Sequence, residues 1–125
     1  ADVQSAMQMW WSCELKALFA RCGCALTRYA AQPGGGAVME VDLGRMRIEG
    51  PQGEAPAPVL LIVVPPDYPL AAPAIMPVDR VGALDRAALA RVGRRVAESL
   101  ASAARRGGPA IFYAVERVVD LLQAS

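Results

Sequence analysis

Three cysteines are the first residues in this sequence whose type and spacing suggest chemistry. Only Gly23 separates Cys22 from Cys24, and Cys13 precedes them. Closely spaced thiolates bind zinc, but a zinc site usually needs four Cys or His ligands, and the sequence has no histidine. We therefore expect three reduced thiols, no metal site and no cofactor. An odd number of close cysteines also indicates a reducing compartment, so we expect an intracellular protein of the cytoplasm or nucleus.

Residues for acid–base or nucleophilic catalysis are missing as well. The sequence contains no histidine to act as a general base, and no pair of acidic residues stands among apolar neighbours. These absences predict that the protein is not an enzyme.

Arginines form the main concentration of charge, within residues 84–106. Five of them form a basic stripe, namely Arg91, Arg94, Arg95, Arg105 and Arg106. No aromatic residues interleave with them and the net charge is only +1, so we expect no binding to nucleic acid or to a membrane surface. No apolar run approaches the ~20 residues of a membrane helix. The stripe is either a solvated helix face or a surface for an acidic peptide or acidic domain, with Arg91 and Arg95 as candidate contacts.

The fold that must position these residues is organised around residues 59–76. Six aliphatic residues, Val59 to Val64, stand between two prolines and predict a buried strand. Four prolines follow within a few residues and lack the amide hydrogen that a ladder needs, so the chain must leave the sheet and turn around Asp67 to Pro69. A second short strand is expected at Ala74 to Met76.

The remaining elements follow from apolar spacing. We expect a helix over 2–22, hairpin strands over 24–31 and 37–43, a helix over 84–106 and a last helix from Pro109. Residues 45–49 are expected to prolong the second strand past a bulge at Gly44. The order α-β-β-β-β-α-α predicts an α+β two-layer sandwich, a four-stranded antiparallel meander with helices on one face. We interpret 1–125 as a single domain in which residues 1–13 extend the first helix.

The segment Tyr68-Pro69-Leu70-Ala71-Ala72-Pro73 resembles the YPxxxP signature of RWD domains, which are non-catalytic relatives of the ubiquitin-conjugating enzyme fold. Residues 14–20 look like the start of that family's first helix. Ile111 and Phe112 look like the pair that opens its last helix. The resemblance implies a protein–protein interaction domain, an adaptor or scaffold piece of a larger protein or complex. Its structural motif would comprise Tyr68, Pro69, Pro73, Ile111 and Phe112.

Tyr68 is expected to be buried beneath the proline-rich turn. A buried tyrosine hydroxyl usually finds a hydrogen-bond partner, and we expect nearby backbone to supply it. The Tyr68–Pro69 peptide bond is left open between cis and trans.

Two other interpretations start from the same stretch. The pattern V-P-x-D-Y-P-x-x-x-P is similar to the C-terminal region of a Mediator tail subunit, which would imply a transcription coactivator. The other hypothesis, from another class, is an inactive conjugating-enzyme variant that binds ubiquitin-like proteins. An active conjugating enzyme is not expected, because the sequence has no cysteine after Cys24 and no asparagine.

An excess of apolar residues predicts a partner chain. In the strand from Val59 to Val64 both faces are aliphatic, although a sheet with helices on one face leaves the other uncovered. Either the long first helix or a partner must cover the open face, and we favour a partner. It would be another domain of this kind or a helical subunit, in a homo- or hetero-oligomer. The predicted contacts are Met9, Trp10, Trp11, Leu60, Ile62 and Val64.

Overall fold

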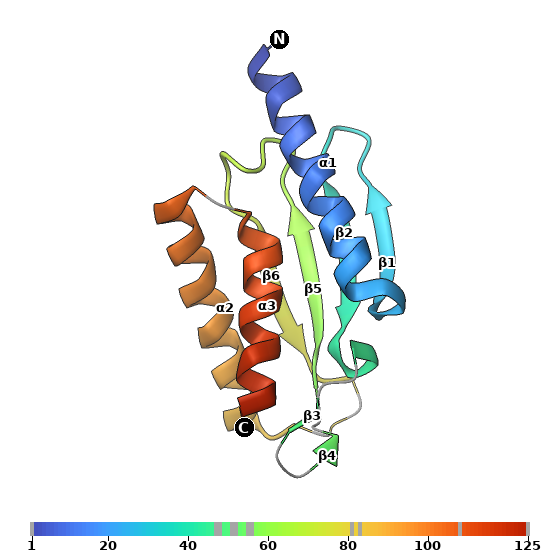
Figure 1. The fold of residues 1–125 in the computed structure, drawn as a ribbon, viewed down its shortest axis with the longest axis vertical. Coiled ribbons are helices and arrows are strands. Elements are labelled where there is room, and N and C mark those ends of the chain that lie inside the picture. Colours follow the sequence, from blue (N-terminus) through green and yellow to red (C-terminus); the bar gives the residue numbers. More distant parts are fainter. Residues whose placement is uncertain are drawn as a thin grey trace.

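A computed structural model describes residues 2–46, 49–50, 53–54, 57–80, 82, 84–107 and 109–124. The helices are α1 (Asp2–Cys22), α2 (Arg86–Arg106) and α3 (Ala110–Ala124), and the main strands are β1 (Leu26–Ala31), β2 (Ala37–Asp42), β5 (Val59–Val64) and β6 (Ala74–Val78). The strands form one antiparallel sheet in the order β1-β2-β5-β6, and Figure 1 shows the three helices on the same side of it. The predicted α+β fold and its order of elements are confirmed.

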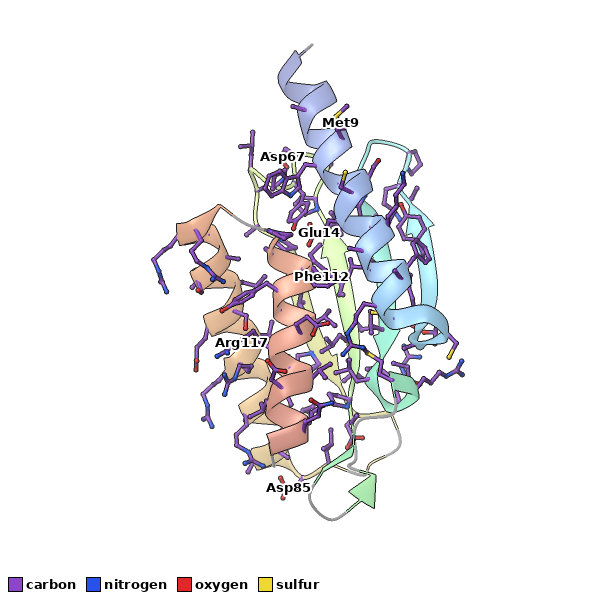
Figure 2. The ribbon with its side chains drawn as sticks, in the orientation of Figure 1. Met9, Glu14, Asp67, Asp85, Phe112 and Arg117 are labelled. Atoms are coloured by element: carbon purple, nitrogen blue, oxygen red, sulfur yellow. The ribbon has the colours of Figure 1, made fainter. Side chains whose placement is uncertain are left out.

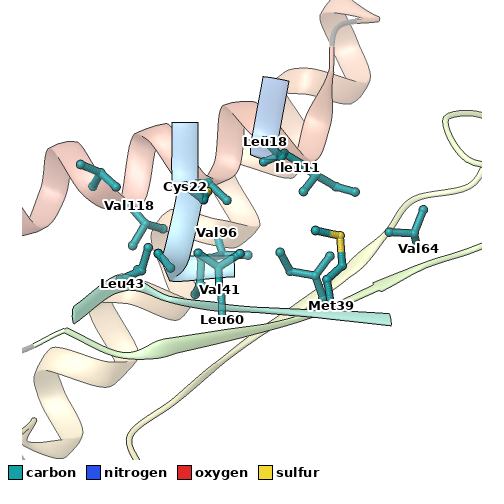
Figure 3. Close-up of a cluster of buried hydrophobic side chains, with 14 of the residues drawn as sticks. Leu18, Cys22, Met39, Val41, Leu43, Leu60, Val64, Val96, Ile111 and Val118 are labelled. Atoms are coloured by element: carbon teal, nitrogen blue, oxygen red, sulfur yellow. The ribbon is translucent and has the colours of Figure 1, made fainter. Parts of the chain in front are cut away.

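The aliphatic strand β5 is central, because it pairs with β2 on one side and β6 on the other. Its register places Leu60 opposite Val41 and Ile62 opposite Met39, and all four side chains are buried. Together with residues from the helices they form the hydrophobic core between sheet and helices, shown in Figure 3. The labelled members are Leu18, Cys22, Met39, Val41, Leu43, Leu60, Val64, Val96, Ile111 and Val118.

This register corrects the predicted partner contacts at Leu60, Ile62 and Val64. The chain's own helices cover these three side chains, which are 0–3% exposed, so no partner can reach them. The polar residues of β2 determine which face of the sheet is buried. Glu40 and Asp42 alternate with the buried Met39 and Val41 and point away from the helices, so the opposite face, with Leu60, Ile62 and Val64, is the one that the helices cover.

The open face of the sheet is nevertheless apolar at its centre. Val63 of β5 is 50% exposed, and Met76 of the neighbouring β6 is 63% exposed. Leu61 pairs with Met76 and is half-buried. The predicted excess of apolar surface therefore exists, but different residues supply it.

A second correction concerns the expected prolongation of β2 over residues 45–49, of which 47 and 48 lie outside the described residues. Leu43–Met46 form a 3₁₀ helix instead. The Asp42 carboxylate accepts a hydrogen bond from the Gly44 amide at 3.1 Å and lies 3.5 Å from Arg45, so the local side-chain bond favours a turn over strand. The chain then forms a separate small hairpin, β3 (Glu49–Gly50) paired with β4 (Gly53–Glu54).

The loop between β1 and β2 and the second helix also have clear local causes. Gly36 has a φ of +78°, and a side chain there would lie 2.2 Å from the Val64 carbonyl oxygen, so only glycine fits. Asp85 caps α2 by accepting a hydrogen bond from the Ala88 amide at 2.6 Å. Gly107, in the left-handed conformation, ends the helix.

Candidate functional site

A buried polar junction joins α1, the proline-rich turn and the start of α3. The Tyr68 hydroxyl donates to Glu14 Oε1 at 2.5 Å and accepts from the amides of Ala110 and Ile111 at 3.0 and 3.4 Å. The second carboxylate oxygen of Glu14 accepts from the Phe112 amide at 2.8 Å. One donor and two acceptor sites are all that a hydroxyl has, so Tyr68 is saturated.

The junction solves a problem common to all helices. The first amides of a helix have no partner within it and must be satisfied from outside. Three consecutive amides of α3 find their acceptors in side chains from two distant segments of the chain, and Pro109 before them has no amide hydrogen. The side chains of Glu14 and Tyr68 therefore fix the start of α3 against α1 and the turn.

The predicted burial of Tyr68 and its hydrogen bonds to backbone are confirmed, since the residue is 3% exposed. Its ring also contacts Trp11 edge-to-face, with centroids 5.7 Å apart. Pro73 is buried, Pro69 is half-buried and the Tyr68–Pro69 bond is cis. The structure thus brings Tyr68 to the start of the last helix, next to Ile111 and Phe112.

The role of Glu14 was missed in the sequence. A signal was present, because Glu14 follows Trp11 by three residues and precedes Leu18 by four, which places it on the apolar stripe of the helix. An acidic residue on a core-facing stripe needs hydrogen-bond donors, and Figure 2 shows Glu14 between α1 and the start of α3.

Burial governs the acid–base properties of the junction. Removal from water raises the pKa of Glu14 above its ordinary value, although hydrogen bonds from Tyr68 and from the α3 amides favour the carboxylate and partly oppose this. Burial, together with the neighbouring Glu14, also raises the pKa of Tyr68, so its hydroxyl stays protonated.

The raised pKa of Glu14 predicts that its contribution to stability grows as the pH falls. The folded chain takes up a proton at Glu14 at higher pH than the unfolded chain, whose ordinary value is 4.5. The free energy of unfolding of wild type minus that of Glu14→Gln should therefore increase as the pH falls from neutral towards 4.5. Urea unfolding at a series of pH values measures it. A difference that is flat, or that grows with rising pH, would contradict the assignment.

An apolar groove lies beside the junction, and we call it the α1 groove. It is a hollow of about 660 Å³ between the N-terminal part of α1 and the start of α3. Its lining residues are Ala6, Met9, Trp10, Cys13, Glu14, Ala17, Pro109 and Phe112. Met9 is 71% exposed and Trp10 is 39% exposed, and Figure 2 labels Met9, Glu14 and Phe112 along this side of the molecule.

Only some of the predicted partner contacts line the α1 groove. Met9 and Trp10 line it, whereas Trp11 is half-buried against Tyr68 and belongs to the chain's own packing. Phe112, predicted only as part of the structural motif, lines the groove as well. Arg91 and Arg95 lie on α2, outside it; Arg91 is exposed, and Arg95 is half-buried.

The thiols do not assemble into a site. All three cysteines are free; Cys13 and Cys24 are exposed, and Cys22 is buried, which raises the pKa of its thiol. Among the residues that the structure describes, no three His, Cys, Asp or Glu side chains are close enough to hold a metal ion.

Within that same part of the chain, no helix has the length and apolar character to cross a membrane. No family model, curated protein or solved structure matches the sequence or its fold.

Proposed function

We propose that this chain is a non-catalytic protein–protein interaction domain of the RWD kind, an adaptor or scaffold piece that binds a helical segment of a partner protein in the α1 groove. The observation that carries the proposal is the exposure of Met9 and Trp10 around an apolar hollow. Large apolar side chains in water are unfavourable by roughly 25 cal/mol per Å² of apolar area, and Trp and Met are enriched where partners dock.

The shape of the α1 groove supports a helical ligand. Helix α1 forms one wall, and Pro109 and Phe112 at the start of α3 form the other. An amphipathic helix that lies in the hollow buries its apolar face in the same way as helix-in-groove complexes do. The walls are also fixed in advance, because Glu14 and Tyr68 bind the start of α3. A preorganised groove loses little conformational entropy on binding.

The residues at the α1 groove support binding rather than catalysis. Its titratable side chains are Cys13 and Glu14. Glu14 is held by Tyr68 and the Phe112 amide, which leaves Cys13 without a base to activate it, and the sequence has no histidine.

Exchange of Trp10 for serine tests the proposal, with Phe19→Ser as the matched control. Phe19 is an aromatic residue of α1 that is 46% exposed, comparable with Trp10, but it lies outside the groove and contacts Tyr29. Tagged chains expressed in the cell of origin are purified with their bound proteins, and each bound protein is then titrated against both variants. We expect Trp10→Ser to weaken binding of the partner about tenfold or more and Phe19→Ser to weaken it less than about threefold.

Light scattering of the isolated chain identifies the case in which the partner is a second copy. A dimer that dissociates in Trp10→Ser and persists in Phe19→Ser agrees with the proposal. Equal partner binding by wild type and Trp10→Ser would refute it.

A further inference from the structure

A second hollow lies between α3 and α2, the two helices that Figure 1 shows side by side, and we call it the α2–α3 groove. Its volume is about 350 Å³. The residues that line it are Glu98, Ser99, Ala101, Ser102, Arg105, Tyr113 and Arg117. Phe112 and Tyr113 are neighbours on α3, yet Phe112 faces the α1 groove and Tyr113 faces this one.

The α2–α3 groove differs from the α1 groove in its chemistry. Two guanidinium groups, from Arg105 and Arg117, and the hydroxyls of Ser102 and Tyr113 lie around it. Arg106 adds a third guanidinium beside it, stacked on the Tyr113 ring at 4.3 Å from the centroid. The three guanidinium groups and the two hydroxyls all present hydrogen-bond donors.

The arginines of this groove have no acidic partner in the part of the chain that the structure describes. The ion pairs there involve Arg21, Arg45 and Arg80, and none involves Arg105 or Arg117. Helix α2 as a whole is strongly basic, with Glu98 as its single acidic residue, although the chain carries a net charge of only +1. Its arginines are Arg86, Arg91, Arg94, Arg95, Arg105 and Arg106.

Tyr113 reports the same positive environment. A hydrogen bond from Ser102 lowers the pKa of its phenol, and the nearby charges of Arg106 and Arg117 lower it further. These groups stabilise negative charge at the phenol oxygen. They would do the same for the oxygen of a ligand placed beside it.

We propose that the α2–α3 groove binds an acidic side chain, the carboxylate of a glutamate or aspartate, in a peptide segment of a partner protein. Arg105 and Arg117 hold the carboxylate oxygens, since the guanidinium group matches the planar carboxylate with paired donors. The Tyr113 hydroxyl, which accepts the hydrogen bond from Ser102, donates its own hydrogen bond to the same group or to the adjacent peptide backbone.

The position of Glu98 selects a peptide over a nucleic acid. Glu98 precedes Arg105 by two helical turns, which is roughly 10 Å along α2. A chain of phosphates that ran the length of the groove would therefore face a carboxylate at one end. A peptide can place a single acidic side chain at the arginines and a neutral or basic residue near Glu98.

Anisotropy of short fluorescein-labelled peptides tests the proposal on the intact chain. The probes are a peptide with glutamates among glycine and alanine, the same peptide with glutamine in their place, and the same with phosphoserine. The groove variant is Arg105→Gln with Arg117→Gln. The matched control is Arg86→Gln with Arg91→Gln, which removes the same charge from α2 roughly 20 Å or more from Arg105.

We expect wild type to bind the glutamate peptide about tenfold or more tightly than the glutamine peptide. The groove variant should lose about tenfold or more in affinity for the glutamate peptide, and the control less than about threefold. Since Arg117 is half-buried, Arg117→Lys, which keeps the charge but loses the paired donors, serves as a second variant that should bind the glutamate peptide more tightly than the groove variant does.

Three results would overturn the proposal. Equal losses in the groove and control variants would assign binding to the general charge of α2. Equal binding of the glutamate and glutamine peptides would remove the role of the carboxylate, and binding of the phosphoserine peptide alone would replace it with phosphate. Trp10→Ser should leave the glutamate peptide unaffected, so a failure here is separate from a failure at the α1 groove.

Discussion

Ile62→Asp is expected to prevent folding, whereas Val63→Asp, one residue further along β5, is expected to leave the fold intact. Ile62 is fully buried between the sheet and the helices, while Val63 is 50% exposed on the open face. A buried carboxylate without a partner costs several kcal/mol, and the lost aliphatic burial adds about 2 kcal/mol. The sum is comparable with the ~5–15 kcal/mol total stability of a typical domain.

Far-UV circular dichroism and the dispersion of amide signals in NMR spectra measure the outcome for both variants. Val63→Asp is the matched control, because it introduces the same charge into the same strand. A folded Ile62→Asp protein, or an unfolded Val63→Asp protein, would show that the two faces of β5 are assigned the wrong way round.

Tyr68→Ala is expected to lower the free energy of unfolding by about 5 kcal/mol, the second largest effect. The variant loses a buried ring, which alone costs about 3 kcal/mol or more, and leaves Glu14 and the first amides of α3 without their partner. Tyr68→Phe keeps the ring and removes only the hydroxyl. It should cost about 2 kcal/mol, because the buried groups that it leaves unpaired are the same.

Chemical denaturation of both variants, with Tyr29→Ala as a control, separates the contributions. Tyr29 is 38% exposed and contacts the ring of Phe19, so its removal should cost about 1 kcal/mol or less. A Tyr68→Phe protein as stable as wild type would mean that the hydroxyl bonds contribute nothing. The structural importance of the junction would then rest on the ring alone.

Most of the fold could be predicted from local pattern. The aliphatic run of β5, the alternation in β2, and the glycines and prolines at the element ends each indicate one conformation, and the structure agrees with them. The failure of the expected strand at residues 45 and 46 is local as well. A short side chain, Asp42, bonds to the Gly44 amide and turns the chain, and such a bond competes with strand continuation without changing the apolar pattern.

Strand β5 alone does not show which of its faces is buried. Both faces are aliphatic, so no alternation of apolar and polar residues distinguishes the buried face from the exposed one. The neighbouring strand β2 makes the distinction, because Glu40 and Asp42 lie on its exposed face. This assigns the faces of β5 only once the register is known, which sets Asp42 opposite Val59. The candidate sites depend even more on tertiary structure. Phe112 and Trp10 meet at one groove only after α1 and α3 pack.

The junction of Glu14, Tyr68 and the start of α3 has a consequence for synthesis on the ribosome. The Glu14–Phe112 bond spans 98 positions, and the bonds of Tyr68 to the α3 amides span 42 and 43. As the chain emerges, Glu14 and Tyr68 leave the exit tunnel long before the amides that complete their hydrogen bonds. Until α3 has been made, a buried Glu14 carboxyl lacks the hydrogen bonds from the α3 amides. Docking of α1 on the sheet is therefore less favourable at that stage. A nascent chain that ends before Ala110 should therefore expose the apolar surface of α1 and be a substrate for chaperones, and the domain closes as a unit only when its last helix has been made.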